Sequence, residues 1–171
     1  MISLPELAGG KVVIMKYKLT NESMINAAGK KLFRIKALVD IEEYGVKKGD
    51  LGGWIEKEDN LSQSGNAWVY GDAEVSGDAE VSGSAKVSGS AEVSGDADYA
   101  VIKGFGTEYR PTTFFRCRDG EARVTCGCFY GTIAEFREQV KRTREGKVAN
   151  EYLKIADLME YHFKEDGEIN G

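Results

Sequence analysis

The stretch that decides the fold is residues 53–100, which read GWIEKE-DNLSQS-GNAWVY-GDAEVS-GDAEVS-GSAKVS-GSAEVS-GDADYA. The chain repeats itself there every six residues, and we call this stretch the repeat segment. Alanine recurs two residues before valine, so both point to one side of a short strand and the residue between them points to the other. The valine column consists of Val69, Val75, Val81, Val87 and Val93.

A short alternating strand followed by a glycine corner, repeated without interruption, is typical of a β-solenoid. Each unit of such a fold buries its narrow apolar face only against its neighbours. The first two units are degenerate, and Ile55 and Leu61 hold the inward column there. The pattern therefore predicts a mainly β protein built on a short parallel β-helix over residues 53–100.

The small residue, the valine two positions later and the turn pair after it resemble the hexapeptide repeat of left-handed β-helices. In that superfamily three hexads make one triangular coil, and its members include acyltransferases and γ-type carbonic anhydrases. The resemblance implies a left-handed β-helix for 48 of the 171 residues. The order of segments, with KKGDLGGWIE before the hexads and a cysteine-containing tail after them, is similar to hexapeptide-repeat proteins encoded by phages and prophages. That second resemblance implies no activity.

The resemblance does not extend to the catalytic groups of the superfamily. Its acyltransferases use a histidine on the coil as general base, and its carbonic anhydrases use three histidines on zinc. This chain has one histidine, His162, and it lies outside the repeat segment. We therefore predict no enzyme, no catalytic residue, no metal and no cofactor. An acyltransferase-like enzyme and a structural scaffold are the alternatives.

The repeat segment is strongly acidic. It holds ten acidic residues against Lys57 and Lys86, a net charge of −8, so the rest of the chain carries +3. If three hexads make a coil, residues eighteen apart stack, which predicts a ladder of Glu56, Glu74 and Glu92. By the same rule Asp78 lies over Asp96 and Glu80 over Asp98. The third face, with Trp68 above Lys86, is not acidic.

An acidic surface can imitate the phosphate track that nucleic-acid-binding proteins recognise. The alternative is that outward acids only keep the strands soluble and apart. On the first interpretation eight acids contact a partner. They are Glu56, Asp72, Glu74, Asp78, Glu80, Glu92, Asp96 and Asp98.

Flanking modules are predicted over residues 1–52 and 101–171. The first is a basic β cap over the first coil, with strands at 15–20 and 31–41 joined by a turn-rich segment. The second is an α+β module that begins with a hairpin around Asp119-Gly120, in which Phe115 faces Val124 and Cys117 faces Ala122. A capping box starts a helix at Thr132 that runs to about 145, and a second helix covers 148–164.

Three cysteines in a chain with no export signal indicate reduced thiols rather than a disulfide framework. Cys117, Cys126 and Cys128 are most simply small core residues. The alternative is a Cys3His zinc site with His162, although the spacing is not a known zinc-ligand pattern.

No apolar run approaches the length of a membrane span, so we expect a cytoplasmic protein that binds no membrane. The function that we expect is non-enzymatic binding of a macromolecular partner through the acidic faces, without direct nucleic-acid binding there. If the chain is encoded by a phage, the expected partner is a host nucleic-acid-handling or defence complex, which it would inhibit. A dimer through residues 101–171 is left open.

Overall fold

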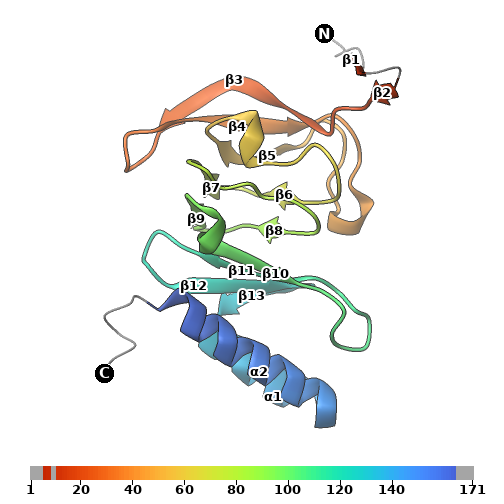
Figure 1. Ribbon diagram of the computed structural model, residues 1–171, viewed down its shortest axis with the longest axis vertical. Helices are drawn as coiled ribbons and strands as arrows, with labels where there is room; N and C mark the ends of the chain where they lie inside the picture. The colour runs from red at the N-terminus through yellow and green to blue at the C-terminus, as the bar shows by residue number, and fades with distance from the viewer. Residues whose placement is uncertain (1–5, 9–10, 165–171) are drawn as a thin grey trace.

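The computed structural model describes residues 6–8 and 11–164, which form a stack of layers (Figure 1). From the N-terminal end these layers are a β-hairpin, the repeat segment, an antiparallel sheet and two helices. The outermost parts of the two predicted flanking modules lie outside the described residues. The strands before the antiparallel sheet are β1 (Glu6–Ala8), β2 (Lys11–Val13), β3 (Tyr17–Ile25), β4 (Lys31–Ala37), β5 (Leu51–Ile55), β6 (Trp68–Val69), β7 (Glu74–Val75), β8 (Lys86–Val87) and β9 (Glu92–Val93).

The second half of the chain supplies the antiparallel sheet and the helices. Its elements are β10 (Tyr99–Ile102), β11 (Thr112–Arg116), β12 (Ala122–Cys126), β13 (Phe129–Thr132), α1 (Ile133–Thr143) and α2 (Gly146–Phe163). Short 3-10 turns are η1 (Glu42–Tyr44), η2 (Glu58–Asn60) and η3 (Asp96–Asp98).

The predicted fold class, a mainly β left-handed parallel β-helix with end modules, is wrong. The chain forms a mixed five-stranded sheet in the order β3-β4-β5-β7-β9, a four-stranded antiparallel sheet and two helices. Within the described residues no sheet is closed or solenoidal. The physical reason is that the hexads form strands of only two residues, while the N-terminal hairpin extends the β5-β7-β9 ladder with antiparallel strands.

The local pattern of the hexads is nevertheless present. Every valine and alanine of the two inward columns is buried except Ala97. The corners need glycine where successive turns of chain approach closely: Gly77 has φ +62°, and a Cβ there would lie 2.4 Å from the Ser94 carbonyl oxygen. Parallel pairing joins Trp68 to Lys86, as predicted, but Trp68 is buried rather than displayed.

The register of the first turn differs from the predicted eighteen-residue spacing. Ile55 pairs with Val75 and Leu61 with Val81, both twenty residues apart, whereas Val69 pairs with Val87 at eighteen. Two extra residues therefore lie between Leu61 and Val69.

These extra residues provide the attachment point of the N-terminal hairpin. The Gln63 side-chain oxygen accepts hydrogen bonds from the Lys16 and Tyr17 amides, at 2.7 and 3.2 Å, and its Nε2 donates to the Tyr17 carbonyl oxygen. Tyr17 packs edge-on against Trp68, with ring centroids 6.3 Å apart. β3 runs through residues predicted as a turn, and the hairpin bends later, at 26–30.

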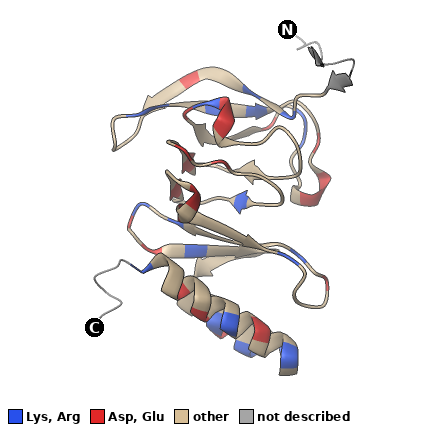
Figure 2. Ribbon diagram, viewed as in Figure 1, with Lys and Arg blue, Asp and Glu red and all other residues tan. Residues whose placement is uncertain are grey.

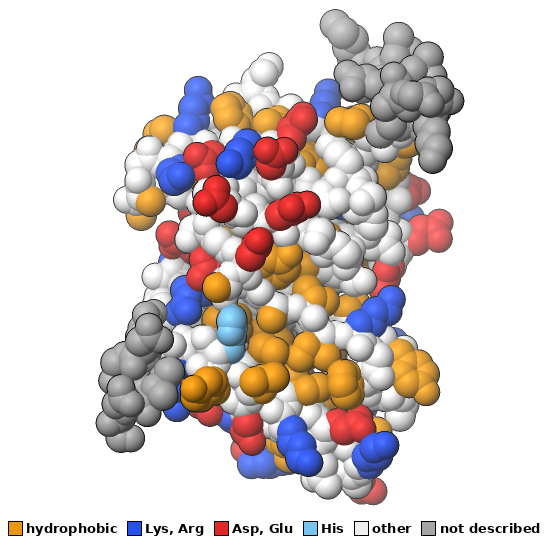
Figure 3. Space-filling model, in the orientation of Figure 1, with side chains coloured by type: hydrophobic (Ala, Val, Ile, Leu, Met, Phe, Trp, Pro, Cys, Tyr) orange, Lys and Arg blue, Asp and Glu red, His pale blue; other side chains and the backbone are white. Residues whose placement is uncertain are grey.

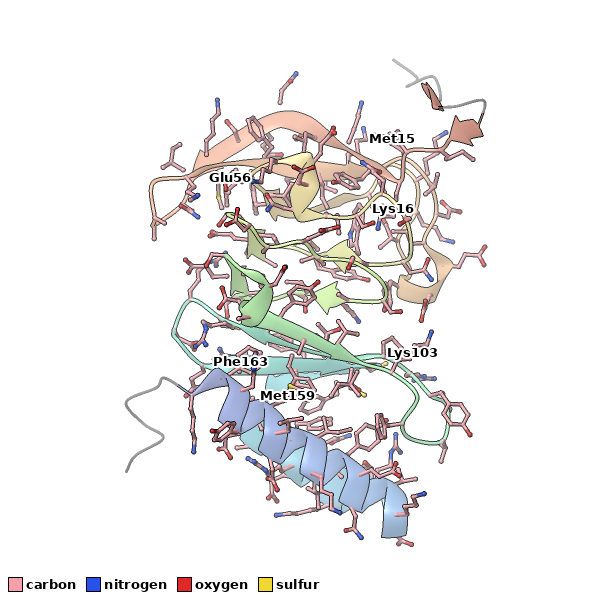
Figure 4. All side chains as sticks on the ribbon, in the orientation of Figure 1. Met15, Lys16, Glu56, Lys103, Met159 and Phe163 are labelled. Atoms are coloured by element: carbon pink, nitrogen blue, oxygen red, sulfur yellow. The ribbon has the colours of Figure 1, made fainter. Side chains whose placement is uncertain are left out.

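Lys16 is not part of a basic surface. It is 4% exposed, and its ammonium donates to the Ala67 carbonyl oxygen at 2.7 Å (Figure 4). Burial lowers the pKa of Lys16 to about 8. The lysine therefore ties the hairpin to the first corner of the repeat segment.

The C-terminal hairpin forms with a register one residue away from the predicted one. Phe114, not Phe115, lies opposite Val124. The reason is a three-residue loop, in which Cys117 N bonds to the Glu121 carbonyl oxygen and Gly120 takes φ +85°. Two further strands, β10 and β13, were missed by the sequence analysis.

Strand β11 separates two hydrophobic cores. Phe115 and Cys117 belong to the core of the repeat segment, and Phe114 belongs to the core beneath the helices. Both predicted helices are confirmed, and Thr132 and Glu135 form the expected capping box. The helices cover the face of the antiparallel sheet that points away from the repeat segment (Figure 1).

Candidate functional site

The most prominent polar feature of the repeat segment is a group of carboxylates at its corners. It comes from η2, from the corner at residues 77–80 and from the start of η3 (Figure 2). We call this group the acidic corner. Its members are Glu58, Asp59, Asp78, Glu80 and Asp96, all of them exposed.

Four of these acids line one shallow hollow of about 530 Å³, together with Lys57 and Gln63. Asp96 lies next to these four acids, because its Oδ1 accepts a hydrogen bond from the Glu80 amide at 3.0 Å. Glu80 is fixed further by the Tyr99 hydroxyl, which donates to its carbonyl oxygen. The hollow therefore brings together carboxylates from two successive turns of the repeat.

The acidic corner has little internal charge compensation. Across residues 6–8 and 11–164, none of its five carboxylates forms an ion pair, and Lys57 is the one cation in the hollow. Like charges held side by side repel each other by some tenths of a kcal/mol per pair in water. A cationic partner would relieve this repulsion.

The predicted ladder of Glu56, Glu74 and Glu92 is only partly present. Glu74 pairs with Glu92, but Trp54 takes the place predicted for Glu56. The two extra residues of the first turn cause this shift, because they displace Glu56 past the end of the ladder.

Glu74 is a structural residue rather than a displayed one. It is 7% exposed, and its Oε1 accepts from Arg118 Nη2 at 3.0 Å. Burial raises the pKa of Glu74, and this effect exceeds the opposing one of the Arg118 guanidinium. Arg118 also donates to the Asp72 carbonyl oxygen, so one guanidinium ties the hairpin loop to the repeat.

Glu56 and Asp98 are also structural residues. Glu56 Oε2 accepts from the Gly77 amide at 2.7 Å and lies 3.4 Å from the Lys30 ammonium, and these hydrogen bonds lower its pKa (Figure 4). Asp98 accepts from the Ser94 and Gly95 amides and from Arg116 Nε. Burial raises its pKa, but the hydrogen bonds from Ser94 and Arg116 outweigh this effect and lower it. The Asp98 carboxylate is therefore held by the corner at residues 94–95 and by β11.

The two remaining predicted acids lie on another side of the repeat. Asp72 and Glu92 line a hollow of about 360 Å³ with Trp54, Glu74 and Arg118. The eight predicted contact acids are thus divided. The structure brings Asp78, Glu80 and Asp96 together, holds Glu56 beside them at the Gly77 amide, and gives the others different surroundings.

Sequence reasoning missed Glu58 and Asp59 as members of the site. They lie at the junction of the two degenerate units, GWIEKE and DNLSQS, where the hexad pattern gave no position for them. The available signal was the interruption itself, because a polar break in a regular repeat marks the place where the chain leaves the stacked strands.

The predicted zinc alternative is not supported by geometry. Cys117 is buried, Cys126 is half-buried and Cys128 is exposed. His162 is exposed, and its Nε2 lies 2.9 Å from the Ala97 carbonyl oxygen. In the part of the chain that the structure describes, no three His, Cys, Asp or Glu side chains are grouped so that they could hold a metal ion.

Comparison of the chain with protein-family models, with curated proteins and with solved structures finds no match. Neither helix of the described residues has the length and apolar character that crossing a membrane requires. The arguments about function therefore rest on the geometry of this chain alone.

Proposed function

We propose that this protein is a non-enzymatic binding protein whose acidic corner contacts a basic surface of a macromolecular partner. The observation that carries the proposal is the convergence of five exposed carboxylates from three successive turns of the repeat, none of which forms an ion pair within the described residues. Figure 3 shows acidic side chains gathered on one face of the molecule, over the repeat segment.

A rigid array of charge is well suited to recognition. The corners are held by parallel strand pairs and by glycine turns, so few degrees of freedom are lost when a partner binds. Exposed charges of one sign accelerate association with a partner of opposite charge and make affinity depend on salt.

The partner class that we favour is a protein that binds nucleic acid. Such proteins carry lysine and arginine along the track of the phosphates, and a row of carboxylates presents the same sign of charge. In this proposal the protein competes with nucleic acid and acts as an inhibitor. A phage origin, with a host defence complex as the target, is the specific form of the proposal that the resemblance in the order of segments suggests.

The test is affinity capture from a nuclease-treated bacterial lysate with a charge-reversed variant. We would replace Asp59, Asp78 and Glu80 by lysine, because the structure shows no side-chain bond that these three residues make to other described residues. The matched control is E42K/E108K/E138K, which changes the net charge equally at exposed acids elsewhere.

The proposal predicts a stoichiometric partner that is captured by the wild type and by the control, is lost with D59K/D78K/E80K, and is displaced by duplex DNA. Equal capture by both triple variants would contradict a role for the acidic corner. A partner that duplex DNA does not displace would contradict competition with nucleic acid.

A further inference from the structure

Strand β10 is the terminal strand of the four-stranded sheet, whose order is β10-β11-β12-β13. It pairs with β11 from Tyr99 to Ile102, and no strand of the described residues pairs with its other edge. In an antiparallel pair, alternate residues direct their N–H and C=O groups away from the partner strand. Two of the four residues of β10 therefore present backbone donors and acceptors at this open edge.

Most edge strands carry features that prevent pairing with another chain. Strand β3, the edge of the five-stranded sheet, carries Lys18 and Glu22 and has a register shift between Leu19 and Ser23. Strand β10 reads Tyr-Ala-Val-Ile, with no charge, no proline and a continuous register. All four of its residues are half-buried.

The surroundings of this edge are apolar on one side and acidic on the other. His162 contacts the Ala97 carbonyl oxygen, which places the end of α2 beside the start of β10. Leu158 and Tyr161, 57% and 60% exposed, lie on that end of α2. Figure 3 shows hydrophobic side chains forming a band across this face, directly beneath the acidic group.

The acidic corner meets the beginning of β10. Asp96 and Tyr99 line a common hollow of about 330 Å³, and the Tyr99 hydroxyl donates to Glu80. The other end of the strand is followed by Lys103 (Figure 4). An occupant of the edge therefore meets negative charge at the start of β10 and positive charge at its end.

We propose that the edge of β10 pairs with an extended segment of the partner, in which apolar residues alternate and lysines or arginines lie at the end beside Asp96. This inference rests on the proposed function, because it names the part of the partner that the acidic corner orients. Backbone hydrogen bonds to β10 supply affinity, and the basic end sets the direction of the segment.

A second copy of this chain fits the edge less well. Antiparallel pairing of two β10 strands would set the acidic corner of each copy, with its five carboxylates, towards Lys103 of the other copy. One ammonium group compensates five carboxylates less well than a segment that carries several lysines or arginines. Charge complementarity therefore favours a basic segment of a different protein.

The test uses two synthetic nine-residue peptides and the isotope-labelled full chain. Both peptides alternate valine and threonine after three N-terminal lysines, and the control peptide is N-methylated at alternate backbone amides. N-methylation keeps the charge and the side chains but removes the donors that pairing with β10 requires.

The inference predicts that the unmodified peptide binds at least about tenfold more tightly than the N-methylated one and slows hydrogen exchange of two alternate amides within residues 99–102. Binding to D59K/D78K/E80K should be weaker for both peptides. Equal binding of the two peptides, or no binding of either, would overturn the pairing at β10.

The inference and the proposed function fail in different ways. Equal peptide affinities that are both lost in the triple variant would leave the acidic corner as the binding site and remove β10 from it. Capture of the same partner by the triple variant would remove the acidic corner instead. Sedimentation of the protein alone completes the test: a dimer whose formation slows exchange of the β10 amides would show that a second copy covers the edge, and would overturn the proposal.

Discussion

Three acids of the repeat segment, Glu56, Glu74 and Asp98, differ from those of the acidic corner in what they contact. Each of the three forms an ion pair with a lysine or arginine from outside the repeat segment. Those of the acidic corner are exposed, and the described residues give them no ion pair. The hexad pattern treats both groups alike, so the difference comes from the elements packed against each one.

The difference shows that the flanking modules determine which acids of the repeat have a structural role. Lys30, Arg116 and Arg118 all lie outside the repeat segment, and each neutralises one of its acids. The modules therefore hold the strand acids in the fold and leave the corner acids available.

The largest effect on stability is expected from removal of Arg118. Arg118→Ala leaves Glu74, which is 7% exposed, without its cation and should lower the free energy of unfolding by about 2 kcal/mol. Urea unfolding measures this change. Adding Glu74→Gln to the same chain should restore part of the loss, and a change below about 0.5 kcal/mol in the single variant would show that the pair does not hold the hairpin loop.

A smaller loss of stability is expected when the attachment point of the N-terminal hairpin is changed. Gln63→Ala removes three hydrogen bonds to the backbone of Lys16 and Tyr17, and should cost about 1 to 2 kcal/mol. Gln63→Glu keeps the acceptor for the two amides and should cost less. Hydrogen exchange at residues 16–17 locates the effect, and unchanged protection in Gln63→Ala would contradict the attachment.

The smallest effect on stability is expected at the acidic corner. D59K/D78K/E80K alters exposed residues that make no side-chain bond within the described chain, so the free energy of unfolding should change by no more than about 0.5 kcal/mol. Urea unfolding of this variant, beside the E42K/E108K/E138K control, checks the expectation. A loss several times larger than in the control would place these acids among the structural ones.

Hexad periodicity predicted the burial of the valine and alanine columns, with Ala97 as the exception, and the pairing of Trp68 with Lys86. It did not predict the sheet order, because the contribution of β3 and β4 depends on contacts between distant segments. The ladder failed at Glu56 because two extra residues lie between Leu61 and Val69. The sequence shows them as a spacing of eight instead of six in the inward column, which a division into equal units did not take into account.

The helices were predicted well because their signals are local. Thr132 and Glu135 are three residues apart, and their reciprocal hydrogen bonds start α1 where the sequence placed it. The acidic corner was predicted only through Asp78, Glu80 and Asp96. Its other members lie on η2, whose position depends on where the first turn leaves the stacked strands.

Titration of the glutamate carboxyl groups by carbon-detected NMR tests the central claim. This claim is that the residues packed against each acid of the repeat segment determine its role. Burial raises the pKa of Glu74 above 4.5, and hydrogen bonds from Gly77 and Lys30 lower the pKa of Glu56 below it. Ionisation of Glu74 therefore reduces stability as the pH rises above 4.5, whereas the stability that Glu56 contributes is complete above 4.5 and is lost as the pH falls through its lowered pKa. The account predicts that the two groups titrate on opposite sides of 4.5, and a common midpoint for both would contradict it.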